Sequence, residues 1–288
     1  MPVVVVTDSS AALQPDLVER YGIRVVPLHV LSGDADFREG IDQVPADLAG
    51  VTTSAASQNE LAETYAEALD SSGGCGVLAV HISRQLSGTW EAGRQAAQTF
   101  DGRVRIIDSQ STGMGLGYPV LEAARAASEG ADLETVYRRS VDVASRGHCL
   151  IIVDRLDQLR RGGRIGTAAA LLGTALAMKP VLHLVDGRLV LKEKTRTTTK
   201  AMSKMVDAAV AYAGLDRTAV AVHHMHAPHR AEAVAQQLNE RIPQISDLVV
   251  TEFSAVIGAH VGVGAVGVVV CPEPVAHGDD GDSSTTLN

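Results

Sequence analysis

The segment VVVVTDSS, from Val3 to Ser10, decides the fold of this 288-residue chain. Four β-branched residues in a row are typical of a strand buried on both faces, and the Thr-Asp-Ser-Ser that follows is typical of a polar loop. From Leu13 to Tyr21 the apolar residues have the spacing of a helix. The chain therefore opens with a strand, a polar loop and a helix, an order found in α/β proteins.

The same alternation continues through the first half of the chain. Strands are predicted at 23–31, 76–82, 104–107 and 150–153, and helices at 60–68, 90–99, 118–128 and 133–144. Ser57 and Glu60 have the spacing of a capping box at the start of the first of these helices. This pattern predicts a mainly parallel sheet flanked by helices, with functional loops at the carboxyl ends of its strands.

The pattern changes after Leu156. We expect a helix at 165–178, a hairpin of 180–185 with 188–192, helices at 198–213 and 228–241, and strands at 218–223, 248–252 and 266–271. The sequence thus predicts an α/β protein with an N-terminal domain at 1–155 and a smaller mixed-sheet domain at 156–274. Residues 275–288, rich in Asp, Gly, Ser and Thr, are expected to form a disordered tail.

Composition limits the classes of function. Apolar residues make up 45% of the chain but aromatic residues only 3%, so any cavity must be lined mostly by aliphatic side chains. Such a lining suits an alkyl chain and equally suits an ordinary packed core. The net charge of −9 argues against non-specific binding of nucleic acid, which requires clustered Lys and Arg.

The cysteines and the apolar segments indicate a compartment. Cys75, Cys149 and Cys271 lack metal or redox spacing, which fits a reducing environment. The Val3–Val6 run has no basic leader before it, and the apolar stretch at 255–271 is interrupted by glycines and His260. We therefore expect a soluble cytoplasmic protein without a membrane span.

Six segments carry a resemblance to a known family. They are VVVVTDSS (3–10), VTTSAAS (51–57), ISRQLSGTW (82–90), DSQSTGMGLG (108–117), LRRGGRIG (159–166) and VIGAHVGVGAVGVVV (256–270). In their order and spacing the chain resembles the DegV family of fatty-acid-binding proteins. The resemblance implies two α/β domains that enclose one long-chain fatty acid in a buried lipid tunnel.

The resemblance also implies a division of labour. The chain would be a carrier without a cofactor, and a partner fatty acid kinase would convert the bound acid to an acyl phosphate. Transient contact with a membrane would serve lipid exchange. The family's carboxylate contacts fall on Thr53, Ser87 and His260, with Ser54 as a close alternative to Thr53.

Two departures from the family pattern concern loop rigidity. Ala56 stands where the family often has proline, and Val263 stands in a Gly-Val-Gly where the family often has Gly-Pro-Gly. Both departures leave the polar side chains in place, so they bear on the fit around the acyl head.

Each site residue also has a structural interpretation. Thr53 and Ser87 precede predicted helices, where hydroxyl groups often cap or form turns. His260 lies in an apolar, strand-like stretch and can be a neutral histidine bonded in the core. If it is instead an imidazolium that contacts the carboxylate, raising the pH through its pKa would weaken ligand retention.

A basic segment lies inside this acidic chain. Between Arg155 and Lys204 there are eleven Lys or Arg and three Asp or Glu. The resemblance favours Arg164 and Arg196 as part of the face presented to the kinase, because Arg suits bidentate contact with phosphate or carboxylate. The alternative is a solvated face.

Two glycine patterns bear on nucleotide or anion binding. Residues 262–267 fit G-x-G-x-x-G, but a strand pattern follows where a dinucleotide site needs a helix, so we expect no NAD. Gly113, Gly115 and Gly117 lie between a strand and a helix, where their amides can bind an anion or simply allow close packing.

Four histidines suggest a metal site only weakly. His223, His224, His226 and His229 crowd one predicted strand-to-helix turn. Neighbouring strand residues point to opposite faces, and no positioned carboxylate accompanies the histidines. We therefore expect no metal.

The alternative function is enzymatic. A serine-dependent lipid esterase would use Ser87, and a phosphotransferase would use the loops at Asp8 and Asp108. Neither a G-x-S-x-G elbow nor a Walker-type phosphate loop is present in the sequence. A purely structural protein would not need hydroxyl-rich loops and glycines gathered near a ligand site.

Overall fold

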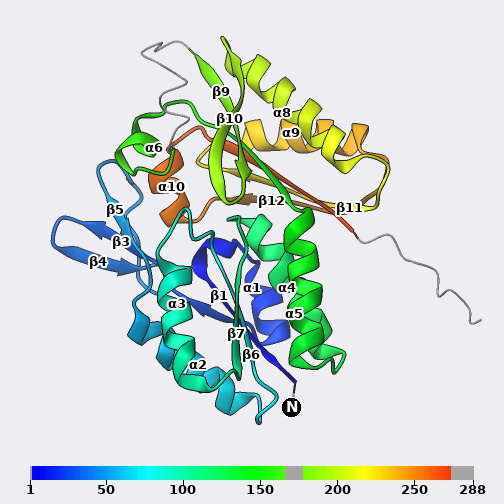
Figure 1. The fold of residues 1–288 in the computed structure, drawn as a ribbon. Coiled ribbons are helices and arrows are strands. Elements are labelled where there is room, and N and C mark those ends of the chain that lie inside the picture. The colour runs from blue at the N-terminus through cyan, green and yellow to red at the C-terminus, as the bar shows by residue number, and fades with distance from the viewer. Residues whose placement is uncertain (1, 166–177, 274–288) are drawn as a thin grey trace, which may run out of the picture.

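The computed structural model describes residues 2–165 and 178–273 (Figure 1). The predicted helix at 165–178 and the predicted tail at 275–288 fall on residues outside this description, apart from the two ends of the helix. The predicted α/β class is confirmed: a parallel sheet flanked by helices is followed by a mixed sheet.

The first sheet is parallel and has the strand order β2-β1-β6-β7. Its strands are β1 (Val4–Asp8), β2 (Arg24–Val26), β6 (Val77–His81) and β7 (Val104–Asp108). Helices α2 (Gln58–Ser71) and α3 (Thr89–Ala97) cover one face, and α4 (Met114–Ser128) and α5 (Leu133–Arg146) cover the other (Figure 1). Short elements complete this part: η1 (Ser9–Ala11), α1 (Pro15–Tyr21) and η2 (Gln98–Phe100). The capping box of Ser57 and Glu60 at α2 is confirmed.

A small antiparallel sheet lies beside the first one, with the order β4-β3-β5. Its strands are β3 (His29–Ser32), β4 (Ala35–Arg38) and β5 (Thr52–Ser54). The prediction of one strand at 23–31 is wrong, because the segment divides at Pro27 into β2 and β3, which belong to different sheets. Proline has no N–H to donate to a sheet, so a strand is readily interrupted there.

The second large sheet is mixed and has the order β10-β9-β8-β13-β11-β12. Its strands are β8 (His148–Ile152), β9 (Lys179–Val185), β10 (Arg188–Thr195), β11 (Thr218–His224), β12 (Ile245–Glu252) and β13 (Val266–Pro272). Its outer face is covered by α8 (Thr198–Ala213) and α9 (Pro228–Arg241). We expected the strand at 150–153 to complete the first sheet; this is wrong, because β8 pairs with β9 and β13.

Two short helices pack against each other, α6 (Asp157–Arg161) and α10 (Ala255–Val261), and α10 also contacts β3 and β5 of the small sheet. The strand-like interpretation of the stretch around His260 is wrong, because this segment is α10. The Ser254 side chain accepts a hydrogen bond from the Ile257 N–H at its start, and Gly262 ends the helix with φ of +76°. A serine cap and a terminal glycine are ordinary helix boundaries.

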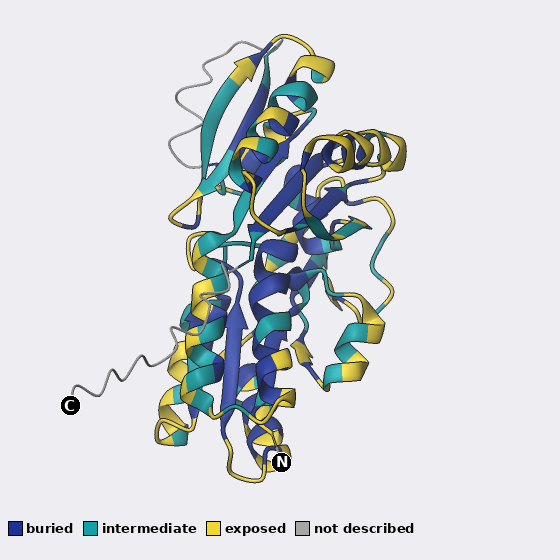
Figure 2. Ribbon diagram, turned by 90° about the vertical axis from the view of Figure 1, so that its right-hand side faces the viewer, coloured by how far each residue is buried: buried dark blue, intermediate teal, exposed yellow. Residues whose placement is uncertain are grey.

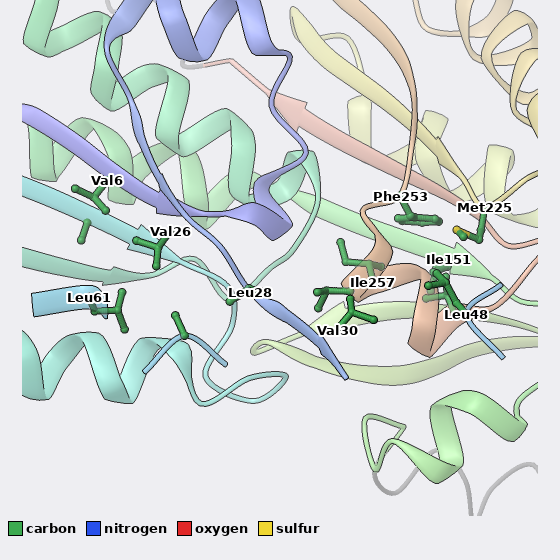
Figure 3. Packing of buried hydrophobic residues seen from close by; sticks show 14 of the residues in the cluster. Val6, Val26, Leu28, Val30, Leu48, Leu61, Ile151, Met225, Phe253 and Ile257 are labelled. Carbon is green, nitrogen blue, oxygen red and sulfur yellow. The ribbon is translucent and has the colours of Figure 1, made fainter. Parts of the chain in front are cut away.

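One hydrophobic cluster runs from the first sheet to the second. It joins Val6 and Leu61 of the first part to Ile151 and Phe253 of the second (Figure 3). Buried strands form the interior while exposed residues lie mostly on the outer faces of the helices (Figure 2). The two parts therefore share a core, and the region between the sheets is the place for an internal site.

Candidate functional site

A cavity lies between the inner face of the second sheet and the elements that connect it to the first. Most of its lining is apolar and comes from the second sheet, α6, α10, the loop after β6 and the connections that precede β3 and α10: Leu28, Ile82, Leu86, Ile151, Leu159, Leu184, Leu189, Phe253, Val256, Ile257 and Val261. A polar group is formed by Thr53, Ser54, Ser87, Arg164 and His260. The four predicted carboxylate contacts thus all line one cavity.

The side chains of Thr53 and His260 are hydrogen-bonded to each other. The distance between Thr53 Oγ1 and His260 Nε2 is 2.7 Å, although the two residues are 207 positions apart in the chain. Thr53 lies on β5 and His260 near the end of α10. Ser57, not Thr53, caps the following helix, so the capping alternative for Thr53 is wrong.

The ring of His260 lies so close to the backbone of Gly162 that a larger residue would not fit at this position. A Cβ on Gly162 would lie 2.4 Å from His260 Nδ1. Burial, together with the smaller effect of the positive charge of Arg164, lowers the pKa of His260 to about 4. His260 is therefore a neutral imidazole near pH 7, which argues against the hypothesis of an imidazolium.

The two serines differ in how their hydroxyl groups are used. The exposed Ser54 donates to the carbonyl of Ala55 at 3.2 Å. Ser87 Oγ lies 2.9 Å from Thr89 Oγ1 and accepts a hydrogen bond from the Thr89 N–H at 3.3 Å. Ser87 thus forms a turn before α3 and also lines the cavity, but it does not cap the helix, whose N-cap is Gly88.

Arg164 and Arg196 lie in different places in the structure, and of the two only Arg164 lines the cavity. Arg164 is half-buried and lines the cavity, where its Nε donates to the carbonyl of Leu86 at 3.0 Å and its Nη1 donates to the carbonyl of Gly162. Arg196 is exposed just before α8 and does not line the cavity. Among the described lining residues Arg164 alone has a permanent charge, a placement that the sequence analysis missed. Its position directly after the Gly162-Gly163 pair in LRRGGRIG was the available signal.

A buried carboxyl group positions α10. Glu39 is 8% exposed; it accepts from Ser9 Oγ at 2.6 Å and from the Val256 N–H at 2.8 Å. Burial raises the pKa of Glu39 above its usual range. The helix that carries His260 is therefore fixed to the loop that follows β1.

A surface hollow adjoins the polar group. It shares Thr53, Arg164 and His260 with the cavity and is also lined by Gln158 and Arg161. The polar end of the cavity is consequently next to the protein surface, with a second arginine beside it.

The glycine segments serve packing. The amides of Gly113, Gly115 and Gly117 donate to carbonyls of Ser10, Thr112 and Gly113, so they are not available to an anion. Gly264 has φ of +86°, and a Cβ there would lie 2.2 Å from Asp154 Oδ2. Residues 262–267 lead from a helix into β13, which is the reverse of a dinucleotide loop.

The expectation that no carboxylate accompanies the crowded histidines is wrong, because Glu252 Oε1 lies 3.8 Å from His224 Nδ1 and 3.7 Å from His226 Nε2. The other two histidines lie apart from this pair. His223 is buried and accepts from the Met114 N–H at 3.0 Å, whereas the His229 side chain is 97% exposed. In the described parts of the chain, no group of three or more His, Cys, Asp or Glu is arranged to hold a metal ion. No described helix is long and apolar enough to span a membrane.

The geometry gives little support to a serine nucleophile. Within residues 2–165 and 178–273 no histidine nitrogen is bonded to Ser87. His81 instead joins Asp8 at 3.1 Å and Tyr65 at 2.7 Å in a buried network. A hydrolase would need a general base within hydrogen-bond reach of the serine.

Comparisons with known proteins extend over the whole fold. A family model described as "Uncharacterised protein, DegV family" matches residues 2–273. A DegV domain-containing protein of Mycobacterium tuberculosis is 47% identical over 272 residues, which cover 94% of this chain and 97% of that protein.

Two similar solved structures are described as those of fatty acid binding proteins. One, described for the fatty acid binding of a DegV family protein from Thermus thermophilus, has 34% identity and a TM-score of 0.89, with 95% of this chain and 100% of that chain covered. The other, described as DegV, a fatty acid binding protein from Bacillus subtilis, has 28% identity and a TM-score of 0.83 at the same coverage.

Proposed function

The chain belongs to the DegV family, and from this premise we propose that it binds one long-chain fatty acid in the cavity between its sheets. The carboxylate would lie at Thr53, Ser54, Ser87 and His260, and the acyl chain would lie among the aliphatic side chains. The observation that carries the proposal is the Thr53–His260 pair at one side of an otherwise mostly apolar cavity.

The chemistry of the lining suits an amphipathic acid. Each methylene group removed from water contributes about 0.8 kcal/mol, so a long acyl chain favours an aliphatic site strongly. A carboxylate taken out of water needs hydrogen-bond donors, which the hydroxyl groups and a neutral imidazole can supply. Arg164 would provide the countercharge. Solved relatives described as fatty acid binding support the same ligand class.

We further propose that the chain is a carrier that presents the carboxylate to a partner fatty acid kinase in the cytoplasm. The surface hollow with Arg161 and Arg164 adjoins the polar end, and two arginines suit a phosphate donor that approaches from outside. Arg196 would contribute to the kinase contact from its exposed position. The chain would exchange its lipid through brief contact with a membrane.

Solvent extraction tests the binding proposal. The purified protein is denatured, extracted with organic solvent, and the extract is identified by mass spectrometry. We expect close to one fatty acid per chain. An extract without fatty acid, together with esterase turnover that Ser87→Ala abolishes, would support the hydrolase instead.

The kinase step needs a separate assay. The loaded protein is mixed with a fatty acid kinase and ATP, and acyl phosphate is trapped with hydroxylamine. We expect product only when both proteins are present, and Arg164→Gln to reduce its rate. Product from the loaded protein alone would contradict the carrier role.

A further inference from the structure

Two polar side chains line the cavity on elements other than those of the Thr53–His260 pair. His223 comes from β11 and is 1% exposed, and Thr112 comes from the loop between β7 and α4. The Met114 N–H donates to His223 Nε2, so the Thr112 loop and the histidine are neighbours. This second polar group lines the same cavity as the first one, whose remaining lining is mostly apolar.

The hydrogen bond from Met114 fixes the tautomer of His223. Burial lowers the pKa of His223 to about 4, so the ring is neutral near pH 7 and carries one proton. Since Nε2 accepts from the Met114 N–H, that proton is on Nδ1. Nδ1 is buried and has no partner among the described residues. The ring therefore presents an unused N–H donor.

The hydroxyl group of Thr112 is in the same situation. Its Oγ1 is buried and has no partner in the described part of the chain. In the described residues, the other buried side-chain polar atoms without a hydrogen bond belong to residues that do not line the cavity: Thr7, Trp90, Tyr118, Arg146, His224 and Ser246. The cavity thus holds two polar groups that its own walls do not satisfy.

An unsubstituted acyl chain would leave both groups unsatisfied. Buried donors without acceptors are unfavourable, and proteins normally provide them with partners or water. A second carboxylate would not fit here, because the ring is neutral and the one permanently charged lining residue, Arg164, belongs to the other polar group. A neutral oxygen on the ligand would fit, since it can accept from the ring and exchange a hydrogen bond with the hydroxyl group.

We propose that the preferred ligand is an oxygenated fatty acid, with a hydroxyl or keto group on its chain that accepts from His223 Nδ1–H and bonds to Thr112 Oγ1. This inference rests on the proposed function, because it assigns the substrate class of the same cavity. The carbon that carries the oxygen would be the one that lies beside β11.

The test compares oxygenated acids with their parents on delipidated full-length protein. Palmitic and stearic acids, ω-hydroxypalmitic acid and stearic acids hydroxylated at successive mid-chain carbons each displace a fluorescent fatty acid. We expect one isomer to bind at least as tightly as its parent, although a hydroxyl group in a purely apolar tunnel would weaken binding.

Two variants assign the preference to the named atoms. Thr112→Val removes the hydroxyl group at nearly constant shape. His223→Gln keeps an acceptor for the Met114 N–H and removes the Nδ1–H. In both we expect the preferred isomer to lose about tenfold in affinity, equivalent to about 1.4 kcal/mol, whereas the parent acid, which makes no hydrogen bond to either side chain, should not bind more weakly. Thr7→Val is the matched control, because Thr7 Oγ1 is also buried and unpartnered but lies outside the cavity.

The outcomes separate this inference from the proposed function. If fatty acids bind but every hydroxylated isomer binds more weakly than its parent, the inference fails and the carrier remains. A preference that persists in Thr112→Val and His223→Gln also overturns it. If no fatty acid binds to the delipidated protein, the proposed function fails and the inference with it.

Discussion

A neutral histidine hydrogen-bonded to a hydroxyl group can donate a hydrogen bond to a carboxylate, but unlike an imidazolium it cannot neutralise the carboxylate's charge. His260 has a pKa of about 4 and is hydrogen-bonded to Thr53, so in the proposed site the countercharge for the carboxylate would come from Arg164. Between pH 6 and 8 the protonation of His260 does not change, and ligand retention should not fall with rising pH as an imidazolium would require. The histidine would then orient the carboxylate through hydrogen bonds and would not supply a charge.

Thr53→Val tests the hydrogen-bonding part of the site. The substitution keeps the β-branched shape on β5 and removes the hydroxyl group that lies 2.7 Å from His260. We expect the affinity for palmitic acid to fall by about tenfold, the usual effect of losing a hydrogen bond to a charged group. Displacement of a fluorescent fatty acid measures it. The neighbouring Thr52 is exposed, so Thr52→Val should leave the affinity unchanged, and equal losses in both variants would contradict the assignment.

The lowered pKa of His260 also predicts how folding stability depends on pH. The unfolded chain binds a proton at this residue below about pH 6.5, whereas the folded chain does so only near pH 4. The contribution of His260 to the free energy of unfolding is therefore fully present above about pH 6.5 and is lost as the pH falls toward 4. We expect His260→Gln to reduce this acid-induced loss by about 1–2 kcal/mol in urea unfolding. The same substitution at His229, which is 97% exposed, should not change the slope.

At the level of elements, local signals predicted some helices completely. The bounds of α8 and α9 match the predictions because Thr197 accepts from the Lys200 N–H at one start and Pro228 stands at the other. The hairpin of β9 and β10 follows from Asp186-Gly187, where both residues have positive φ. These features depend on neighbours in sequence.

Other elements depend on distant partners and could not be predicted in this way. The apolar pattern of β8 fits a strand in either sheet, and only its pairing with β13 decides between them. In α10, β-branched residues and glycines resemble a strand, but burial between α6 and β3 favours the helix over its weak propensity.

Gly162→Ala tests how α6 positions α10. Gly162 ends α6 with φ of −71°, so alanine has no backbone penalty, but its Cβ would lie 2.4 Å from His260 Nδ1. We expect His260 to be displaced from Thr53 and fatty acid affinity to fall by about tenfold. Calorimetric titration of the delipidated protein measures it.

Gly147→Ala is the control for this prediction. Gly147 ends α5 with a similar φ of −70°, and the nearest atom to an added Cβ is 3.8 Å away. This variant should bind fatty acid like the unaltered chain. A Gly162→Ala variant with full affinity would mean that His260 can move without loss of the site.

At the scale of the whole molecule, the site exists only where distant segments meet. The resemblance identified Thr53, Ser54, Ser87 and His260, and these line one cavity. It did not identify Thr112 and His223, nor the cavity position of Arg164. Their roles depend on the packing of one sheet against the loops of the other, which no local pattern in the sequence encodes. The family resemblance therefore named four residues that share one cavity, and periodicity predicted the architecture, but neither predicted the shape of the cavity.

Glu39 links the two parts of the molecule and gives the last prediction. Its carboxyl group joins Ser9, which follows β1, to the Val256 N–H in the first turn of α10. Glu39→Ala would leave a buried N–H without a partner, so we expect the free energy of unfolding to fall by about 2–3 kcal/mol. Fatty acid affinity should fall with it, because α10 carries His260. Glu39→Gln can still accept from Val256 and donate to Ser9, and should retain most of both quantities in urea unfolding and ligand displacement. If alanine and glutamine have the same effect, the charge of Glu39, and not its hydrogen bonds, holds the two parts together.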